Sequence, residues 1–375
     1  MSPNGTDVTI DLTWWLENFP ADSITFTLGR GIRIAGGDGV EVVGKDERDV
    51  HYQTKFSNPL HLQYVVPETA LISLPESGYL EVSHQHHWLP DVQGERYERP
   101  FTYAVEYVGP EAFSFYGLGE RTVTDRSTTV ESSKPTTIAS LFLSRVVEDV
   151  SLKDIRVVNF VDSLTTADLD SLRVLGEAVG AFYGELFPEH PVDPATVYVC
   201  PTDIRQPTSL TSYATEESAF RLGYVARRRS LEYAFAHEMA HFWWNFGAGD
   251  NAGPNGFLNE SFAQYSSYLF YREVHGESAF RELIEGVREQ LHWAGLIITG
   301  EERYASPGSA TQMLYGVGPV ILYDLHRQLG DADFLAFLSA VLQRRPETLP
   351  EFADWLKTTY AGDARFAEFT ERVSG

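Results

Sequence analysis

Residues 237–241 read His-Glu-Met-Ala-His, and they lie in the stretch 231–246, whose apolar spacing predicts a helix. His237 and His241 are four residues apart, so in a helix both imidazoles lie on the same face and can reach one metal ion. Glu238 is one step round the helix from His237, so it can lie beside the metal without filling a coordination position. The pattern therefore predicts a metal site on one helix.

Two histidines do not complete such a site, because a catalytic zinc usually takes three protein ligands and leaves a fourth position for water. The next helical segment opens at 255–256 and contains Glu260. The eighteen residues 242–259 that separate it from His241 are enough to end one helix, turn and bring a second helix back antiparallel. We therefore expect Glu260 to lie opposite the two histidines.

The alternative to a metal site is a structural role for the same side chains. Two histidines and two glutamates would then be buried beside the aromatic run 242–244 without a metal. That arrangement would leave unpaired charge in a hydrophobic core, which costs free energy. The pattern thus favours a metal centre.

These residues resemble the aminopeptidase N family of gluzincin zinc peptidases, which includes leukotriene hydrolase. The match lies in His237-Glu238-x-x-His241, in the eighteen-residue gap after it, and in the segment 258–263, which reads Leu-Asn-Glu-Ser-Phe-Ala. The resemblance implies that His237, His241 and Glu260 bind Zn²⁺. It also implies that Glu238 acts as general base on a zinc-activated water.

The family also places a tyrosine well beyond the third ligand, in a Tyr-x-Lys-Gly sequence before a helix. Here Tyr315-Gly-Val-Gly318 stands 55 residues after Glu260. The resemblance therefore implies that the Tyr315 hydroxyl stabilises the transition-state oxyanion, whereas the alternative for this residue alone is a core aromatic. The resemblance covers roughly residues 138–375 and is sharp at 237–265 and 315–335.

The chain departs from the family pattern in three places. Aminopeptidases of the family carry Gly-x-Met-Glu-Asn, whose Glu binds the α-ammonium of the substrate, and 195–225 contains no such sequence. The nearest acidic residues in place are Glu216 and Glu217, which are the candidate substrate-binding residues. Ser267 stands where the family often has an acidic residue, and Val317 replaces the lysine. The zinc hydrolase core survives these departures, whereas the exopeptidase assignment weakens.

The hydrophobic pattern changes along the chain. Residues 7–110 alternate apolar and polar positions between Gly, Pro, Asn and Asp clusters, which predicts an antiparallel sheet or sandwich. The segment 117–137 reads as a polar link rich in Thr, Ser and Arg. A helix at 167–187 comes next, between strands at 155–161 and 196–200.

From about residue 228 onward the spacing is helical, with one face at 280–291 and a capping-box pattern, Thr-Leu-Pro-Glu, at 348–351. We therefore expect an α+β protein. An N-terminal β-sandwich-like domain, 1–125, precedes a thermolysin-like catalytic domain, 126–375, that is α/β first and then mainly helical. Compared with the family, we expect a compact form without the C-terminal helical domain.

Composition excludes several classes of partner. The chain has 375 residues, with 29 Lys plus Arg against 53 Asp plus Glu, and a net charge of −24. Nucleic acids and anionic membranes bind clustered Lys and Arg, and the only basic run is 227–229, so neither is expected as a partner. Cys200 is the single cysteine, which excludes an intrachain disulfide and a thiolate metal cluster.

The first residues, 1–11, contain no apolar signal-peptide core, and no stretch approaches the roughly 18 apolar residues of a spanning helix. We therefore expect a cytoplasmic, soluble protein. His84, His86 and His87 form a second histidine cluster in the β-rich part. A polar loop or strand edge is the simpler interpretation of this cluster, and a second metal site is the alternative.

Three functions remain open from the sequence. The first is a zinc metallopeptidase, an aminopeptidase that cleaves short peptides. The second is a zinc amide or peptide hydrolase of a dedicated processing or biosynthetic pathway that does not recognise a free N-terminus. The third is a non-catalytic binding protein on the same fold.

Overall fold

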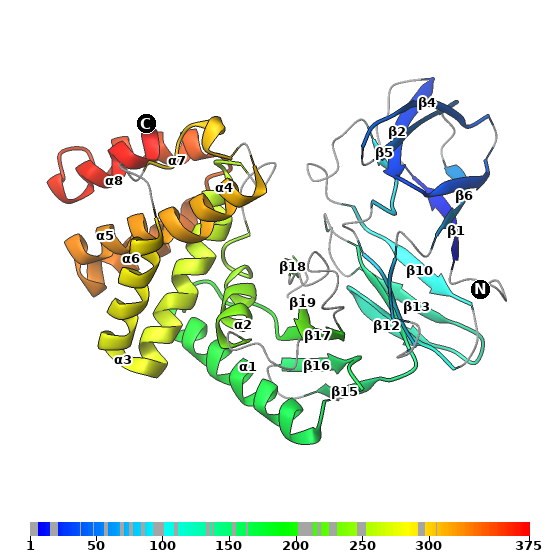
Figure 1. Ribbon diagram of the computed structural model, residues 1–375, viewed down its shortest axis with the longest axis horizontal. Coiled ribbons are helices and arrows are strands. Elements are labelled where there is room, and N and C mark those ends of the chain that lie inside the picture. The colour runs from blue at the N-terminus through cyan, green and yellow to red at the C-terminus, as the bar shows by residue number, and fades with distance from the viewer. Residues whose placement is uncertain are drawn as a thin grey trace.

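The computed structural model describes most of the chain. The described residues are 7–15, 22–37, 39–47, 49–55, 59–67, 71–74, 78–83, 87–92, 101–108, 112–132, 136, 139–151, 155–162, 164–201, 213–215, 219–224, 231–245, 253–291, 297–304 and 306–375. Strands of the N-terminal part form one half of the molecule and helices of the C-terminal part form the other (Figure 1). A sheet with one long helix lies between them, so the predicted α+β order is confirmed.

Two antiparallel sheets begin the chain. Their order is β1 (Val8–Trp14), β6 (Leu60–Val66) and β3 (Arg33–Gly36) in one, and β4 (Glu41–Lys45), β5 (Asp49–Lys55), β2 (Ser23–Gly29) and β9 (Asp91–Val92) in the other. In β6, Leu62 and Tyr64 are buried while His61 and Gln63 are exposed. This is the period-two alternation that the sequence predicted for this part of the chain.

Two further sheets follow, and the second of them contradicts the expected polar link at 117–137. Their order is β11 (Ser114–Gly117), β14 (Leu141–Ser144), β8 (Tyr79–Val82) and β7 (Ile72–Leu74), and β10 (Ala104–Tyr107), β13 (Thr128–Glu131) and β12 (Glu120–Val123). The link is in fact the pair β12 and β13, in which only Val130 is buried. Arg121 covers the ring of Tyr116 at 4.4 Å and donates to the Phe115 carbonyl. Strands that face solvent can be built from polar residues, and this is why composition alone misled.

The sheet in the middle of the molecule has five strands. Its order is β15 (Glu148–Ser151), β16 (Ile155–Asn159), β17 (Ala195–Pro201), β19 (Ala219–Tyr224) and β18 (Tyr213–Thr215). The three inner strands are parallel and both edge strands are antiparallel. The helix α1 (Thr166–Leu186) connects β16 to β17, begins with a capping box between Thr165 and Asp168, and packs Gly176 against Ile155. These elements agree with the predicted strand–helix–strand unit.

An aromatic cluster joins this sheet to the N-terminal half. Phe142 of β14 stacks on Tyr198 of β17 at 5.0 Å and on Phe160 at 5.5 Å. The Tyr198 hydroxyl donates to the Gly117 carbonyl at 2.7 Å. Both faces of β14 are therefore covered, and all four of its residues are buried. The domain boundary at 125/126 stays a prediction, and the core of the N-terminal half includes residues up to Leu143.

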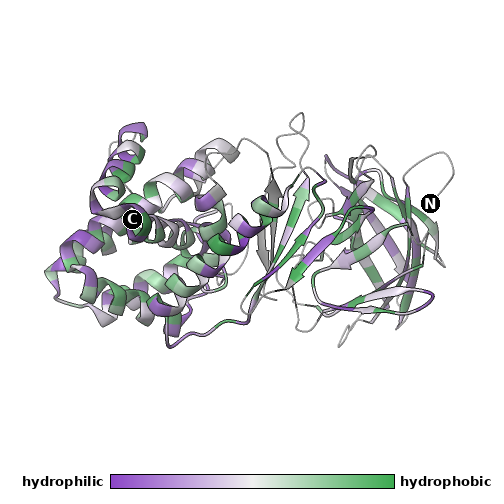
Figure 2. Ribbon diagram, turned by 90° about the horizontal axis from the view of Figure 1, so that it is seen from below, coloured by the Kyte–Doolittle hydropathy of each residue, from purple (hydrophilic) through white to green (hydrophobic). Residues whose placement is uncertain are grey.

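The C-terminal part is a helical array that is hydrophobic toward its interior and more hydrophilic outside (Figure 2). Its helices are α2 (Leu231–Ala240), α3 (Phe262–Gln290), α4 (Pro307–Gln312), α5 (Gly318–Leu329), α6 (Asp331–Arg344), α7 (Leu349–Thr359) and α8 (Ala364–Ser374). Three short segments join them, the π-helices η4 (Phe257–Ser261) and η6 (Met313–Val317) and the 3₁₀-helix η5 (Glu301–Tyr304). None of the described helices is long and apolar enough to cross a membrane.

Local signals set the ends of these helices. Thr348 accepts a hydrogen bond from the Glu351 backbone, as the capping pattern predicted, and Gly362, at φ 84°, separates α7 from α8. The face expected at 280–291 is the last part of α3, which turns sharply at Gly276, at φ 83° and ψ 169°. Glycine tolerates this left-handed backbone, so one long helical segment can change direction there.

Candidate metal centre

The two histidines of the sequence motif lie at the end of α2. His237 is in its last turn, and His241 begins the next turn, where its backbone N–H donates to the Glu238 carbonyl at 3.3 Å. The helix thus ends at Ala240, earlier than the predicted 246, although Trp244 still donates to the Ala240 carbonyl. The continued turn keeps both imidazoles on one side of the chain.

Glu260 reaches the histidines from the π-helix η4. α3 continues from η4 and packs against α2, so the antiparallel return predicted from the gap is present. Trp244 fixes this pairing, because its indole donates to the Ser266 hydroxyl of α3 at 2.9 Å. Ser266 and Trp244 are both buried, so this hydrogen bond connects the two helical segments within the core.

The three donor atoms have the spacing of a zinc site. Nε2 of His237 and Nε2 of His241 are 3.1 Å apart, and Oε2 of Glu260 lies 3.3 Å and 3.4 Å from them. Ligands bound tetrahedrally at about 2.0–2.1 Å from zinc are separated by about 3.3 Å. Among the described residues these three form the one group of His, Cys, Asp and Glu that can hold a metal ion. The nitrogen and oxygen donor set fits Zn²⁺.

Backbone contacts orient one of the ligands. The Nδ1–H of His241 donates to the Trp244 carbonyl at 3.2 Å, so its Nε2 remains available for a metal. Burial lowers the pKa of His241, but the carboxylates of Glu260 and Glu238 outweigh burial and raise this pKa to about 9. His241 is therefore protonated beside Glu260 at neutral pH, and a bound zinc ion would require the loss of this proton because a ligating imidazole must be neutral.

The pKa values of the other two ligands are both lowered, for different reasons. Burial lowers the pKa of His237 more than its hydrogen bond to Glu260 raises it. Burial alone would raise the pKa of Glu260, but His241 and His237 hold it well below its usual range. Glu260 is therefore ionised and supplies the negative charge that a divalent cation requires.

Tyr315 lies beside the same carboxylate. It belongs to the π-helix η6, and its hydroxyl donates to Oε2 of Glu260 at 2.7 Å. The side chain is 37% exposed, which argues against the alternative of a core aromatic. Burial of the hydroxyl, with the charges of Glu260 and Glu238, raises the pKa of Tyr315. The phenol is therefore a hydrogen-bond donor at neutral pH.

Glu238 is buried next to this group, with a side chain 7% exposed in a residue type that is rarely buried. Its charge raises the pKa of both His241 and Tyr315, so it acts on the site from close by. A carboxylate held near a metal group without being one of its ligands can accept a proton.

Several predicted residues are not part of the described site. Glu216 and Glu217 lie outside the described residues, and so do His84 and His86. His87 bonds to Asp49 through Nδ1 at 2.6 Å, in the N-terminal half. For the second metal site the described residues therefore offer no support.

Two departures from the family pattern have structural consequences. Ser267 is buried, and its hydroxyl donates to the Gln264 carbonyl of its own helix at 2.7 Å. Val317 is buried at the end of η6, so an apolar contact replaces the lysine. The sequence did not reveal that Trp244 orients His241 through a backbone carbonyl, because no side-chain signal marks such a contact.

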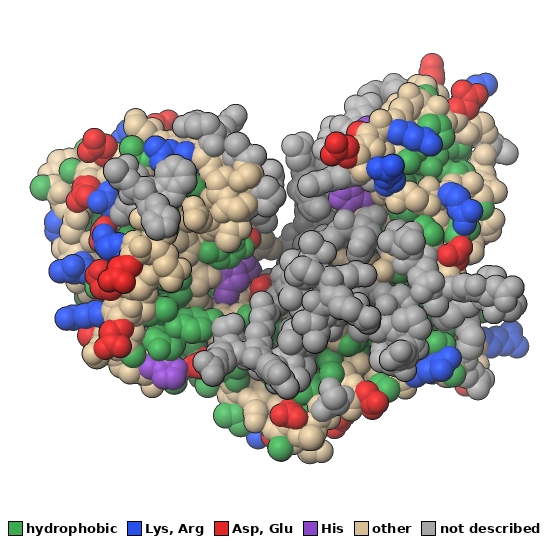
Figure 3. Space-filling model, viewed as in Figure 1, with side chains coloured by type: hydrophobic (Ala, Val, Ile, Leu, Met, Phe, Trp, Pro, Cys, Tyr) green, Lys and Arg blue, Asp and Glu red, His purple; other side chains and the backbone are tan. Residues whose placement is uncertain are grey.

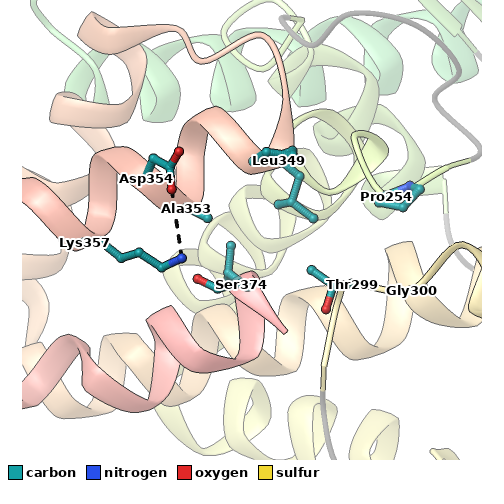
Figure 4. A pocket seen from close by; sticks show the side chains of 10 residues that line it. Pro254, Thr299, Gly300, Leu349, Ala353, Asp354, Lys357 and Ser374 are labelled. Atoms are coloured by element: carbon teal, nitrogen blue, oxygen red, sulfur yellow. Dashed lines mark ion pairs between the residues drawn. The ribbon is translucent and has the colours of Figure 1, made fainter.

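Figure 3 shows one face of the molecule with its side chains coloured by type. On the face shown, the molecule is hollowed between the helical part and the N-terminal part, and Lys and Arg side chains lie singly among Asp and Glu (Figure 3). A separate cavity of about 280 Å³ lies where α7 and α8 meet Pro254 and the segment 299–300 (Figure 4). Leu349, Ala353, Lys357 and Ser374 line it, and none of the metal-centre residues does.

Comparison with known proteins gives a fold and no sequence family. No protein-family model and no curated sequence matches the chain. The M1 zinc metallopeptidase from Deinococcus radiodurans is similar in structure, with a TM-score of 0.64 and 19% identity over 98% of this chain and 88% of that one. A variant of that enzyme bound to a Tyr-Ser-Ala substrate gives a TM-score of 0.65 and 18% identity, over 98% of this chain and 90% of that one.

Leukotriene A4 hydrolase from Saccharomyces cerevisiae has a similar structure, with a TM-score of 0.64 and 14% identity. The match covers 97% of this chain and 63% of the yeast enzyme. The chain therefore has the fold of M1 zinc metallopeptidases, and its His-His-Glu group fits the metal that those enzymes are named for.

Proposed function

We propose that the protein is a zinc metallopeptidase that hydrolyses peptide bonds. The observation that carries the proposal is the spacing of His237, His241 and Glu260, whose donor atoms lie 3.1–3.4 Å apart, as tetrahedral zinc ligands do. Glu238 and Tyr315 complete the site with a buried proton acceptor and a hydroxyl donor. A protein that only binds peptides has no use for this combination.

Each residue has a role that its surroundings explain. His237, His241 and Glu260 would hold the zinc ion, which would supply Lewis-acid chemistry and lower the pKa of a water toward about 7. Glu238 takes a proton from the water as the water oxygen bonds to the peptide carbonyl carbon. It gives this proton to the departing amine when the C–N bond breaks. Tyr315 donates a hydrogen bond to the oxygen that becomes negative in the transition state.

The proposed substrates are short peptides with a free N-terminus, as for an aminopeptidase. One structural neighbour was crystallised with a Tyr-Ser-Ala substrate, which supports a peptide as the ligand class for this fold. Glu216 and Glu217 are the candidates to bind the substrate's α-ammonium. The missing Gly-x-Met-Glu-Asn sequence favours the second candidate, a peptide or amide hydrolase that does not require a free N-terminus.

Matched free and N-acetylated tripeptides test both candidates. The zinc-loaded protein should cleave the free peptides, and acetylation should abolish cleavage if a carboxylate binds the ammonium group. Glu216→Ala and Glu217→Ala, made separately, should identify that carboxylate through a raised KM. Equal cleavage of both peptide sets would establish the second candidate, and no cleavage of either by zinc-loaded protein would refute the peptidase proposal.

A further inference from the structure

Glu260 and Tyr315 both lie in π-helical turns, one in η4 and the other in η6. π-helical turns are rare and occur frequently at functional sites. Here each turn opens directly into an α-helix, η4 into α3 and η6 into α5. The two turns are in contact, although 55 residues separate Glu260 from Tyr315.

One buried hydrogen bond connects the two turns. The hydroxyl of Ser261, the residue after Glu260, donates to the carbonyl of Leu314, the residue before Tyr315, at 2.7 Å. Ser261 is fully buried and Leu314 is 3% exposed, so water does not compete for either group. Each partner of this bond is therefore the chain neighbour of a residue in the site.

Gly318 makes the close approach of the turns possible. A Cβ atom at this position would lie 2.1 Å from the Ser261 hydroxyl oxygen and 2.5 Å from the Ser261 Cβ. Real Cβ atoms do not come so close to other atoms, so the serine occupies the space that a side chain at 318 would need. Ser261 thus packs against the first residue of α5 and bonds to η6, so it is held on both sides of the junction between these elements.

We infer that Ser261 is a positioning residue for Tyr315, acting through its bond to the Leu314 carbonyl. The bond sets how far the phenol lies from Oε2 of Glu260 and hence where its proton can be donated. The inference rests on the proposed function in assigning the phenol to catalysis. Among the described hydrogen bonds the Ser261 hydroxyl contacts η6 alone, and His237, His241 and Glu238 lie in neither π-helical turn.

Ser261→Ala removes the hydroxyl and leaves the Leu314 carbonyl buried without that donor. We expect it to keep its zinc and to lower kcat roughly 10- to 100-fold, because small misplacements of a catalytic group cost that much. KM should change little, because the phenol acts on the transition state. In the Tyr315→Phe background, Ser261→Ala should lower kcat no further, since residues that act through one another are not additive.

Ser144→Ala is the matched control. Ser144 is fully buried and also donates to a backbone carbonyl, that of Val146 at 2.6 Å, but it lies in β14. Ser144→Ala should lower the free energy of unfolding about as much as Ser261→Ala does, and it should leave kcat unchanged. If Ser261→Ala does not fold, Ser261→Cys keeps a donor at this position, although a weaker one on a larger atom, and should show a smaller loss of kcat.

A second measurement does not depend on turnover. With 3-fluorotyrosine at position 315, Ser261→Ala should shift the ¹⁹F resonance and Ser144→Ala should not. If the zinc-loaded parent cleaves no peptide while the resonance shifts, the proposed function fails and the positioning by Ser261 stands. An unchanged resonance together with an unchanged kcat in Ser261→Ala would overturn the inference, as would fully additive losses in the double variant.

Discussion

Oε2 of Glu260 is the atom on which the candidate site converges. It lies 3.3 Å and 3.4 Å from the two imidazole nitrogens and accepts the hydrogen bond of Tyr315 at 2.7 Å. The phenol can donate its hydrogen bond either to this carboxylate or to an oxyanion of a reacting substrate, and a metal ion held by Glu260 would weaken the first of these bonds. The two histidines and the Tyr315 hydroxyl therefore all contact the same oxygen of Glu260.

Tyr315→Phe removes the donor and leaves the three ligands intact. We expect kcat to fall by about 10²–10³, which is the usual cost of one oxyanion donor. The zinc content should stay at the parent level because the phenol is not a ligand. Unchanged turnover would move the oxyanion role to another group, and loss of zinc would show that Tyr315 supports the metal instead.

His241→Ala should abolish stoichiometric zinc binding, because two remaining protein ligands do not hold a catalytic zinc. Elemental analysis of the purified variant measures this. His275→Ala is the control, since His275 lies on the surface and bonds to Glu232 through Nε2 at 3.2 Å. Zinc retained by the His241 variant and lost by the His275 variant would contradict the assignment.

A hydrogen-bonded series of side chains, buried at Tyr265 and His326 and exposed at Asp331, connects the helices that follow the two π-helical turns. The Tyr265 hydroxyl of α3 bonds to Nδ1 of His326 in α5 at 2.8 Å, and Nε2 of His326 bonds to Asp331 of α6 at 2.7 Å. Arg272 completes the series by donating to Asp331 at 2.9 Å. α3 continues from η4, and α5 continues from η6. The hydrogen bonds between these helices therefore also help to fix the two π-helical turns relative to each other.

The same series of side chains predicts a pH dependence of stability. Burial lowers the pKa of His326, and Arg272 lowers it further, whereas Asp331 and Glu277 raise it less. The unfolded protein therefore binds a proton that the folded protein does not, and stability falls as the pH drops below the unfolded value of about 6.5. Asp331, whose pKa is lowered chiefly by Arg272, titrates at lower pH and does not contribute in this window.

Urea unfolding of the zinc-loaded protein at about pH 7.5 and about pH 5.5 measures this effect. The free energy of unfolding should drop between the two values, and the drop should be smaller in His326→Gln, which cannot take up the proton. An equal drop in both proteins would show that His326 is not the titrating group.

Across the molecule, sequence patterns predicted the features that helix geometry dictates. Four-residue spacing places His237 and His241 together in any helix, and the eighteen-residue gap allows an antiparallel return to Glu260. The strands β12 and β13 were missed because they face solvent and lack an apolar alternation. The π-helical turns at 257–261 and 313–317 were not predicted, because no residue type in these segments indicates such a turn.

The whole fold places the metal centre at the junction of its two kinds of structure. The five-stranded sheet packs on the N-terminal half through Phe142 and Tyr198, and α1 anchors α2 through a hydrogen bond from the Tyr183 hydroxyl to the Ala236 carbonyl at 2.8 Å. The last turn of α2, which carries His237, is thereby fixed to the sheet. The site therefore depends on both the sheet and the helical array.

The activity and zinc content of Glu238→Gln, measured side by side with the parent, bear on the proposed chemistry most directly. The substitution keeps the shape of the side chain and removes the base, so the variant should bind zinc like the parent and hydrolyse peptides roughly 10²–10⁴ times more slowly. Hydrolysis at the parent rate by the zinc-loaded variant would contradict the assignment of Glu238 as the base.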